Sequence, residues 1–150
     1  MKLKTVIIFI CCLLYAGTDP VSAQYPRNPL KDQKQYVPAP RDIFLSIEEG
    51  IAMQEIDKFS KYFDSQTYLS LSNGISGYYS ANQVFYILQD FFRIYQPVNF
   101  RFLSVSDKSE TPYASGYYRY ESKGLRGTSQ IYIALKKTGS NWKISQITIN

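Results

Sequence analysis

The chain has 150 residues, the size of one folded domain, and a formal net charge of +5 at pH 7. It contains no histidine, and its only two cysteines are Cys11 and Cys12. Because histidine is the usual base of catalytic triads and the commonest zinc ligand, this composition excludes Ser-His-Asp and Cys-His catalysis. The lysines and arginines are scattered rather than gathered into a basic stripe, so we expect no nucleic-acid partner.

The first residues have the pattern of an export signal. Lys2 and Lys4 precede an apolar run at residues 6–15, and residues 21–23 offer a cleavage site. The run is shorter than the ~20 residues of a membrane span. We therefore expect a signal peptide at residues 1–23, cleavage near Ala23, and an exported chain, periplasmic or secreted, with no stable membrane span. Because both cysteines leave with this leader, the mature chain would have neither a disulfide nor a thiol nucleophile.

Residues 24–41 have no hydrophobic period, and they hold four prolines among polar side chains: Pro26, Pro29, Pro38 and Pro40. This composition predicts a proline-rich linker, which leaves residues 42–150 as the folded domain.

The first helix is predicted to begin at Asp42 or Phe44 and to continue to Phe63. Its apolar residues recur at helical spacing and form one face: Ile47, Ile51, Ala52, Ile56, Phe59 and Phe63. Gly50 lies inside this helix, where glycine costs ~1 kcal/mol relative to alanine. This cost indicates that the helix packs closely against another element at Gly50.

A short strand is predicted at residues 67–72, because apolar and polar side chains alternate there. Asn73-Gly74 and Gly77 then indicate a turn. The second helix is predicted to begin after Ser80, because Gln83 completes a capping box with it. It carries a wide apolar stripe and ends near Tyr95, since Pro97 cannot continue a helix.

Four strands are expected after Pro97. In the first, Val98, Phe100 and Phe102 are predicted to face the core, and Asn99, Arg101 and Leu103 to face away from it. The others are predicted at residues 113–122, 126–137 and 141–149. In the last strand Trp142 and Ile144 are out of phase with Ile147 and Ile149, which predicts a β-bulge near Ser145-Gln146.

The run Tyr117 to Glu121 alternates so that Tyr118 and Tyr120 share one face, and Tyr117, Arg119 and Glu121 the other. The run lacks the glycine or alanine that separates the aromatics of an RNA-binding strand. We therefore interpret it as cross-strand aromatic packing with an Arg–Glu pair outside.

The element order, with "KYFD" at residues 61–64, "YYSANQ" at 78–83 and W-x-I-x-x-I-x-I at 142–149, resembles an uncharacterised family of exported bacterial proteins. This family belongs to the nuclear transport factor 2-like superfamily, and the resemblance covers residues 43–149. It implies an α+β fold in the order α-β-α-β-β-β-β, with two helices on a strongly curved, mainly antiparallel sheet. Such domains form a cone with a pocket at its wide end, and they often dimerise through the outer sheet face.

The absence of catalytic groups predicts a non-enzymatic binding domain without metal or cofactor. It would take a small apolar ligand in the cone or a protein partner, another copy included, on the sheet. The candidate pocket lining is Phe59, Phe63, Phe91, Tyr95, Phe100, Phe102, Tyr118 and Trp142. One alternative is an isomerase or hydrolase in which Asp64 or Asp90, with a raised pKa, acts as the base beside a tyrosine donor. A second alternative is an assembly or structural factor of the cell envelope.

Overall fold

The computed structural model describes residues 36–150, so the predicted signal peptide and residues 24–35 of the predicted linker lie outside the described residues. Three helices are present: α2 (Pro40–Met53), α3 (Asp57–Ser60) and α4 (Ala81–Ile94). Six strands accompany them: β1 (Phe63–Leu71), β2 (Ser76–Tyr79), β3 (Gln96–Ser106), β4 (Tyr113–Ser122), β5 (Leu125–Thr138) and β6 (Asn141–Ile149).

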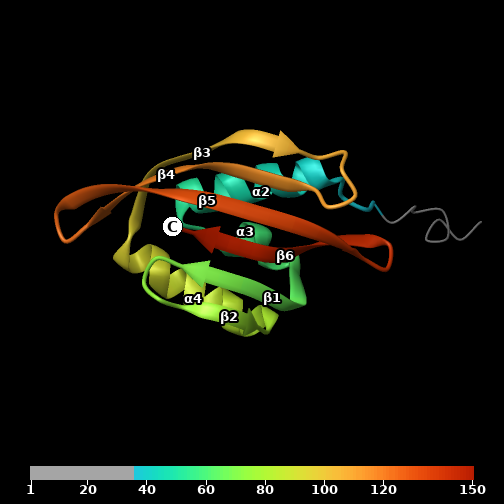
Figure 1. Ribbon diagram of the computed structural model, residues 1–150, viewed down its shortest axis with the longest axis horizontal. Helices are drawn as coiled ribbons and strands as arrows, with labels where there is room; N and C mark the ends of the chain where they lie inside the picture. The colour runs from blue at the N-terminus through green and yellow to red at the C-terminus, as the bar shows by residue number, and fades with distance from the viewer. Residues whose placement is uncertain (1–35) are drawn as a thin grey trace, which may run out of the picture. The chain divides into compact units, whose positions relative to one another are not determined.

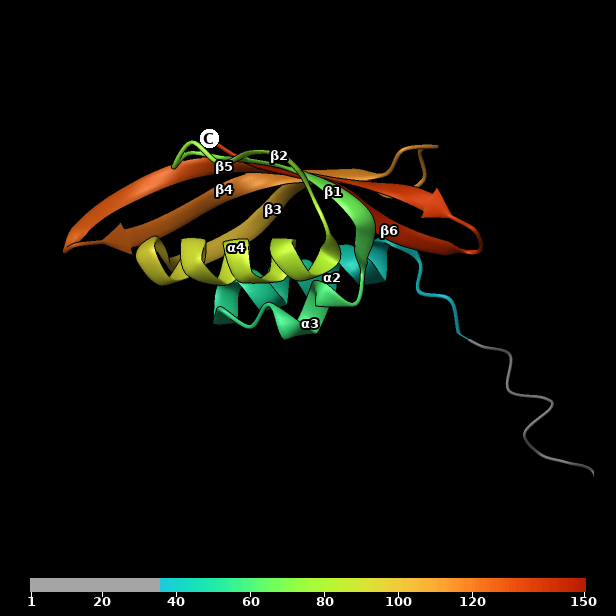
Figure 2. The ribbon, with the colours of Figure 1, turned by 90° about the horizontal axis from the view of Figure 1, so that it is seen from below.

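The strands form one sheet in the order β2-β1-β6-β5-β4-β3. Only β1 and β6 pair in parallel, and the other neighbours are antiparallel. All three helices lie behind the sheet in Figure 1 and below it in Figure 2, where the long β4–β5 hairpin bends down around them. The predicted class, an α+β fold with helices on a curved, mainly antiparallel sheet, is confirmed. The face that the helices leave uncovered is called the outer face below.

The prediction of a single helix that continues to Phe63 is wrong, because the chain turns after Met53. Gln54 adopts a left-handed conformation with φ of 60°, and the Glu55 N–H donates to the Gly50 carbonyl at 2.7 Å. The turn starts the short α3, which brings the buried ring of Phe59 back against α2. Ala52, expected on the apolar face, is exposed. The apolar period continued across a backbone reversal that periodicity alone does not reveal.

The second helix agrees with its sequence signals. The Ser80 N–H donates to Gln83 Oε1 at 2.9 Å, and α4 ends at Ile94, one residue before the predicted end. The buried residues Val84, Leu88, Phe91 and Phe92 lie on one side of the helix, in agreement with the predicted apolar stripe.

The first strand is longer than predicted, and β2 was missed. β1 begins at Phe63, where a helix was expected, and pairs through Leu69 with Gly77 of β2. Gly77, read as part of a turn, is a strand residue, whereas the turn at Asn73-Gly74 is confirmed. The four-residue β2 is too short for its alternation to be distinguished from a loop.

Bulges shift the register of β3 and β6. Between Pro97 and Asn99 the pairing with β4 skips Val98, and between Phe102 and Ser104 it skips Leu103. Val98 is consequently 56% exposed, so the prediction that it faces the core is wrong, whereas Phe100 and Phe102 are buried as predicted. The bulge expected near Ser145-Gln146 is confirmed, because Gln146 and Ile144 oppose the adjacent Ala134 and Leu135 and leave Ser145 without a partner.

Gly50→Ala tests the contact between α2 and α3. Helix propensity alone would stabilise the protein by ~1 kcal/mol. A Cβ at Gly50, however, would lie 2.5 Å from Phe59 Cδ1 and 2.9 Å from the Glu55 carbonyl oxygen. We expect the free energy of unfolding in urea to fall by about 1–3 kcal/mol. The exposed Ala52→Ser serves as control and should change it by less than about 0.5 kcal/mol. A stabilising Gly50→Ala would contradict the close packing.

Candidate functional site

The aromatic side chains proposed to line a cone pocket form part of the hydrophobic core. Six of the eight are at most 8% exposed: Phe59, Phe63, Phe91, Phe100, Phe102 and Tyr118. Tyr95 and Trp142 are half-buried and pack against the same core. The structure therefore brings the predicted residues together between the helices and the sheet.

These rings contact one another at packing distance. Ring centroids are 5.7 Å apart for Phe59 and Phe63, 4.8 Å for Phe91 and Tyr95, and 4.9 Å for Phe100 and Phe102. Five hollows of about 180 to 400 Å³ open on the surface of residues 36–150, and Phe102 is the one candidate that lines any of these five. Close contacts of this kind fill space as a core does.

Tyr118 is a structural group within this core. Its hydroxyl donates to the Tyr95 carbonyl at the C-terminal end of α4. Burial and the neighbouring Tyr120 raise the pKa of Tyr118 well above its ordinary value, so the phenol stays protonated. The Tyr118 hydroxyl proton is donated to a backbone carbonyl, and this hydrogen bond joins β4 to the end of α4.

Neither proposed carboxylate base lies in the cone. Asp64 is buried and forms an ion pair with Lys136 of β5, whereas Asp90 lies on the exposed side of α4, 2.9 Å from Arg93. Burial alone would raise the pKa of Asp64. The hydrogen bonds from Lys136 and from the Ser65 N–H outweigh it, however, and the pKa of Asp64 is lowered. This direction is opposite to the one that a general base in an apolar pocket requires.

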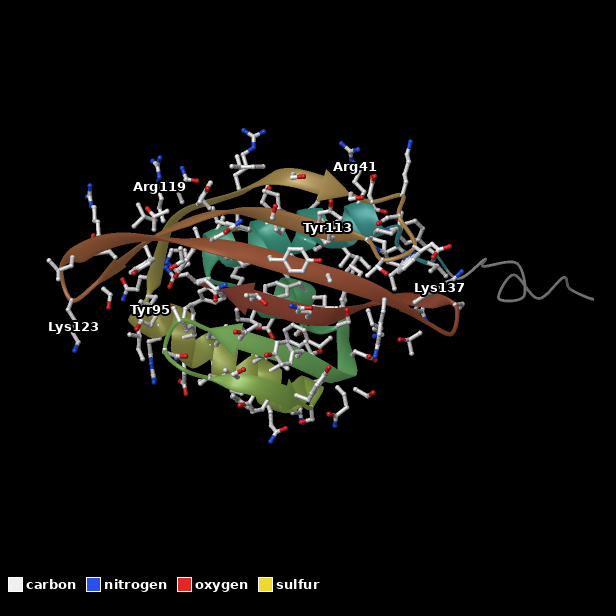
Figure 3. The ribbon with its side chains drawn as sticks, in the orientation of Figure 1. Arg41, Tyr95, Tyr113, Arg119, Lys123 and Lys137 are labelled. Atoms are coloured by element: carbon white, nitrogen blue, oxygen red, sulfur yellow. The ribbon has the colours of Figure 1, made fainter. Side chains whose placement is uncertain are left out.

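Exposed apolar and basic side chains gather instead on the outer face of β3 and β4. Asn99, Arg101, Leu103, Tyr117 and Arg119, called the β3–β4 patch below, line a hollow of about 320 Å³. Asn99 lies opposite Arg119, and Arg101 opposite Tyr117. Leu103 is 70% exposed and Tyr117 56%. Figure 3 shows Arg119 extending away from the ribbon.

Two neighbouring rows across the outer face are uncharged and rich in hydroxyl groups. The strand registers place one row across all six strands: Tyr78, Tyr68, Gln146, Ala134, Tyr113 and Ser106. The next row is Ser76, Ser70, Thr148, Tyr132, Ser115 and Ser104. The Tyr113 and Tyr132 rings stack with centroids 5.7 Å apart, and Tyr113 lies over the middle of the sheet in Figure 3. Tyrosine and serine together are the chemistry of antibody paratopes.

The alternation along residues 98–103 already predicted that Asn99, Arg101 and Leu103 face away from the core. The assembly of the patch was missed, because the partner residues Tyr117 and Arg119 depend on the strand register. A register is set by bulges and turns, which single-strand patterns do not encode.

Within residues 36–150, no helix is long and apolar enough to cross a membrane. The same residues contain no cluster of three or more acidic, histidine or cysteine side chains that could hold a metal ion.

The arrangement of helices and sheet is that of nuclear transport factor 2-like proteins. A protein of unknown function described as NTF-2 like, from Shewanella oneidensis, is 13% identical to this chain. The likeness covers 73% of this chain and 93% of that one, with a TM-score of 0.53. A hypothetical protein with a ketosteroid isomerase-like fold from Catenulispora acidiphila, in complex with trimethylamine, is 10% identical. The likeness covers 75% of this chain and 86% of that one, with a TM-score of 0.59.

The chain belongs to the DUF4783 family, a domain of unknown function whose sequence model matches residues 44–150. The crystal structure of a DUF4783 family protein from Bacteroides uniformis is similar, with 15% identity and a TM-score of 0.63 over 71% of this chain and 94% of that one. A comparison with curated proteins found no match. The resemblance inferred from the sequence, an uncharacterised family of this superfamily, is confirmed.

Tyr118→Phe and Tyr117→Phe compare adjacent tyrosines on opposite faces. Removing the Tyr118 hydroxyl leaves the Tyr95 carbonyl without this donor, and we expect the free energy of unfolding to fall by ~1 kcal/mol. Tyr117 is exposed, so Tyr117→Phe should change it by less than about 0.5 kcal/mol. Equal effects in urea unfolding would contradict the assignment of the two faces.

Asp64→Asn tests the buried ion pair through pH. Because the folded-state pKa of Asp64 is lowered, its contribution is complete above the unfolded pKa of about 3.9 and is lost as the pH falls through the folded value. We expect Asp64→Asn to reduce the free energy of unfolding by ~1 kcal/mol at pH 7 and to flatten its decline below about pH 5.

The matched control is Asp90→Asn, which removes an exposed pair and should cost less than about 0.5 kcal/mol. Urea unfolding of both variants from neutral to acidic pH measures the difference. A profile of Asp64→Asn as steep as that of the unaltered protein would contradict the role of this pair.

Proposed function

We propose that the chain is an exported, non-enzymatic binding domain that takes a protein partner on the outer face of its sheet. The observation that carries the proposal is the contrast between the two faces. The inward aromatic rings are buried in the core. Leu103 and Tyr117, in contrast, are exposed to solvent and line one hollow with Arg101 and Arg119. The pattern of residues 1–23 supports export.

The composition of the outer face supports a protein partner. Tyrosine and arginine are enriched at protein interfaces, and exposed aliphatic side chains add apolar area to them. Tyr113, exposed on β4, extends the apolar surface beyond the β3–β4 patch. Tyr113 and Tyr132 present rigid, stacked rings that lose little conformational entropy on binding.

The charge of the patch supports an acidic partner. Among the described residues, no ion pair includes Arg101 or Arg119, although they lie on neighbouring strands of one hollow. Like charges on neighbouring strands repel each other, and a bound anion would compensate this repulsion. A second copy meeting face to face would bring further arginines, so a different protein with surface carboxylates fits better.

The rival functions have less support. An apolar ligand in the cone would have to displace rings that already contact one another. The alternative of an enzyme with a carboxylate base has no supporting geometry, because the pKa of Asp64 is lowered and Asp90 lies on the helix surface. The envelope assembly factor also uses a protein-binding face, and the partner's identity would separate it from other binding roles.

Site-specific photo-crosslinking tests the proposal. A benzophenone amino acid placed at Leu103 should form one discrete adduct with a protein in the native host, because Leu103 lies at the centre of the proposed interface. The Arg101→Glu/Arg119→Glu variant should lose this adduct, since it reverses the charge that selects the partner. Lys123→Glu reverses one positive charge outside the patch, at the exposed β4–β5 turn, and should keep the adduct.

The same probe at Tyr86, exposed on α4, is the control for non-specific reaction. An adduct twice the mass of the chain would replace the acidic partner with a second copy. No adduct at Leu103, or equal labelling at Tyr86, would reject the outer face as the binding surface.

A further inference from the structure

A second hollow lies on the outer face, at the opposite end of the sheet from the β3–β4 patch. It has a volume of about 400 Å³ and is lined by Gln66, Tyr68, Tyr78, Lys136, Ser145 and Gln146, called the polar hollow below. Its residues come from β1, β2, β5 and β6, and none of them belongs to the patch. It is therefore a separate candidate site.

Backbone irregularities in two strands coincide at this hollow. Phe63 pairs with Ile144 and Tyr68 with Gln146, so β1 advances five residues while β6 advances two. The same segment of β6 carries the bulge at Ser145. The Thr67 hydroxyl donates to the Ile144 carbonyl at 3.0 Å and fixes the arched part of β1. The backbone irregularities therefore coincide with the hollow, and exposed side chains such as Tyr78 and Gln66 complete its lining.

The polar hollow is electrically balanced. Lys136 is its one charged lining residue, and the buried carboxylate of Asp64 pairs with its ammonium group. Lys143 is the other cation near Asp64, but its ammonium donates to the Lys61 carbonyl at 2.8 Å. A phosphate or carboxylate would find no uncompensated cation on this lining, in contrast to the two arginines of the patch. The balance favours a neutral ligand.

The lining combines an aromatic wall with fixed polar groups. Tyr78 is 71% exposed, and its ring lies edge-on to that of Tyr68 at 5.2 Å. The Tyr68 hydroxyl lies 3.1 Å from Ser76 Oγ, and Gln146 Nε2 donates to Thr148 Oγ1 at 3.1 Å. This second bond orients the Gln146 amide and leaves its oxygen as an acceptor. The exposed Gln66 supplies another amide.

We infer that the polar hollow binds a neutral saccharide. A sugar ring is uncharged, has an apolar face of C–H groups that can lie on Tyr78, and carries hydroxyls around its rim for the Gln66 and Gln146 amides. A purely apolar ligand would leave those amides without water or a partner, which is costly. The site is independent of the protein-binding face proposed above.

Titration of the ¹⁵N-labelled protein with neutral oligosaccharides tests the inference. The probes are glucose-, mannose-, galactose- and N-acetylglucosamine-containing oligosaccharides, followed by amide chemical shifts up to about 10 mM, which nearly saturates a site with Kd of about 1 mM. At least one should shift the amides of Gln66, Tyr68 and Gln146 while leaving those of Leu103 and Tyr117 unchanged.

Paired substitutions separate the site from general surface effects. Tyr78→Ala and Gln66→Ala should each weaken binding at least tenfold. Tyr86→Ala and Gln89→Ala, the same exposed residue types on α4, should leave it unchanged. The inference is overturned if no member of the panel binds, if the control variants weaken binding equally, or if inorganic phosphate or a hexuronate competes at the same amides. Because the shifts expected on binding and the substitutions that weaken it lie outside the β3–β4 patch, the result is independent of the photo-crosslinking experiment.

Discussion

The contact between the inward aromatic rings and the helices is the constraint on which the rest of the structure depends. Phe100 and Phe102 of β3 and Tyr118 of β4 are buried with Phe59 and Phe91 in one core. The Tyr118 hydroxyl adds a directional bond to the end of α4. Because these rings occupy the space that a cone pocket would need, the inner face contributes stability rather than a cavity.

The curvature of the sheet links this core to the outer surface. The bulges at Val98 and Leu103 bend the edge strand around the core, and the bulge at Val98 turns an apolar side chain toward solvent. A further bulge at Ser145 shifts the register of β6, beside the arch of β1. The features that close the sheet over its helices therefore also shape the two hollows of its outer face.

Charge divides the outer face into two chemically different regions. At the polar hollow a buried carboxylate neutralises Lys136, which leaves a surface suited to hydrogen bonding. At the β3–β4 patch no described carboxylate meets Arg101 or Arg119, which leaves a surface suited to anions. Uncharged rows rich in tyrosine and serine cross the sheet from the polar hollow towards the edge strand β3.

Local patterns along the sequence determined most of the secondary structure. The capping pair Ser80 and Gln83, the stop at Pro97 and the phase change before Ile147 each act through near neighbours, and α4 and the β6 bulge formed as predicted. The outward turn of Val98 depended on the register with the distant strand β4, whereas the reversal at Gln54 and the four-residue β2 are local features that periodicity did not reveal. Sequence also identified the rings that gather at the centre, because burial of aromatics follows from hydrophobicity.

Only the tertiary structure decided that those rings contact one another as core. It alone brought Arg101 beside Tyr117 and Lys136 onto Asp64, since strand register and side-chain packing arise between segments rather than within them.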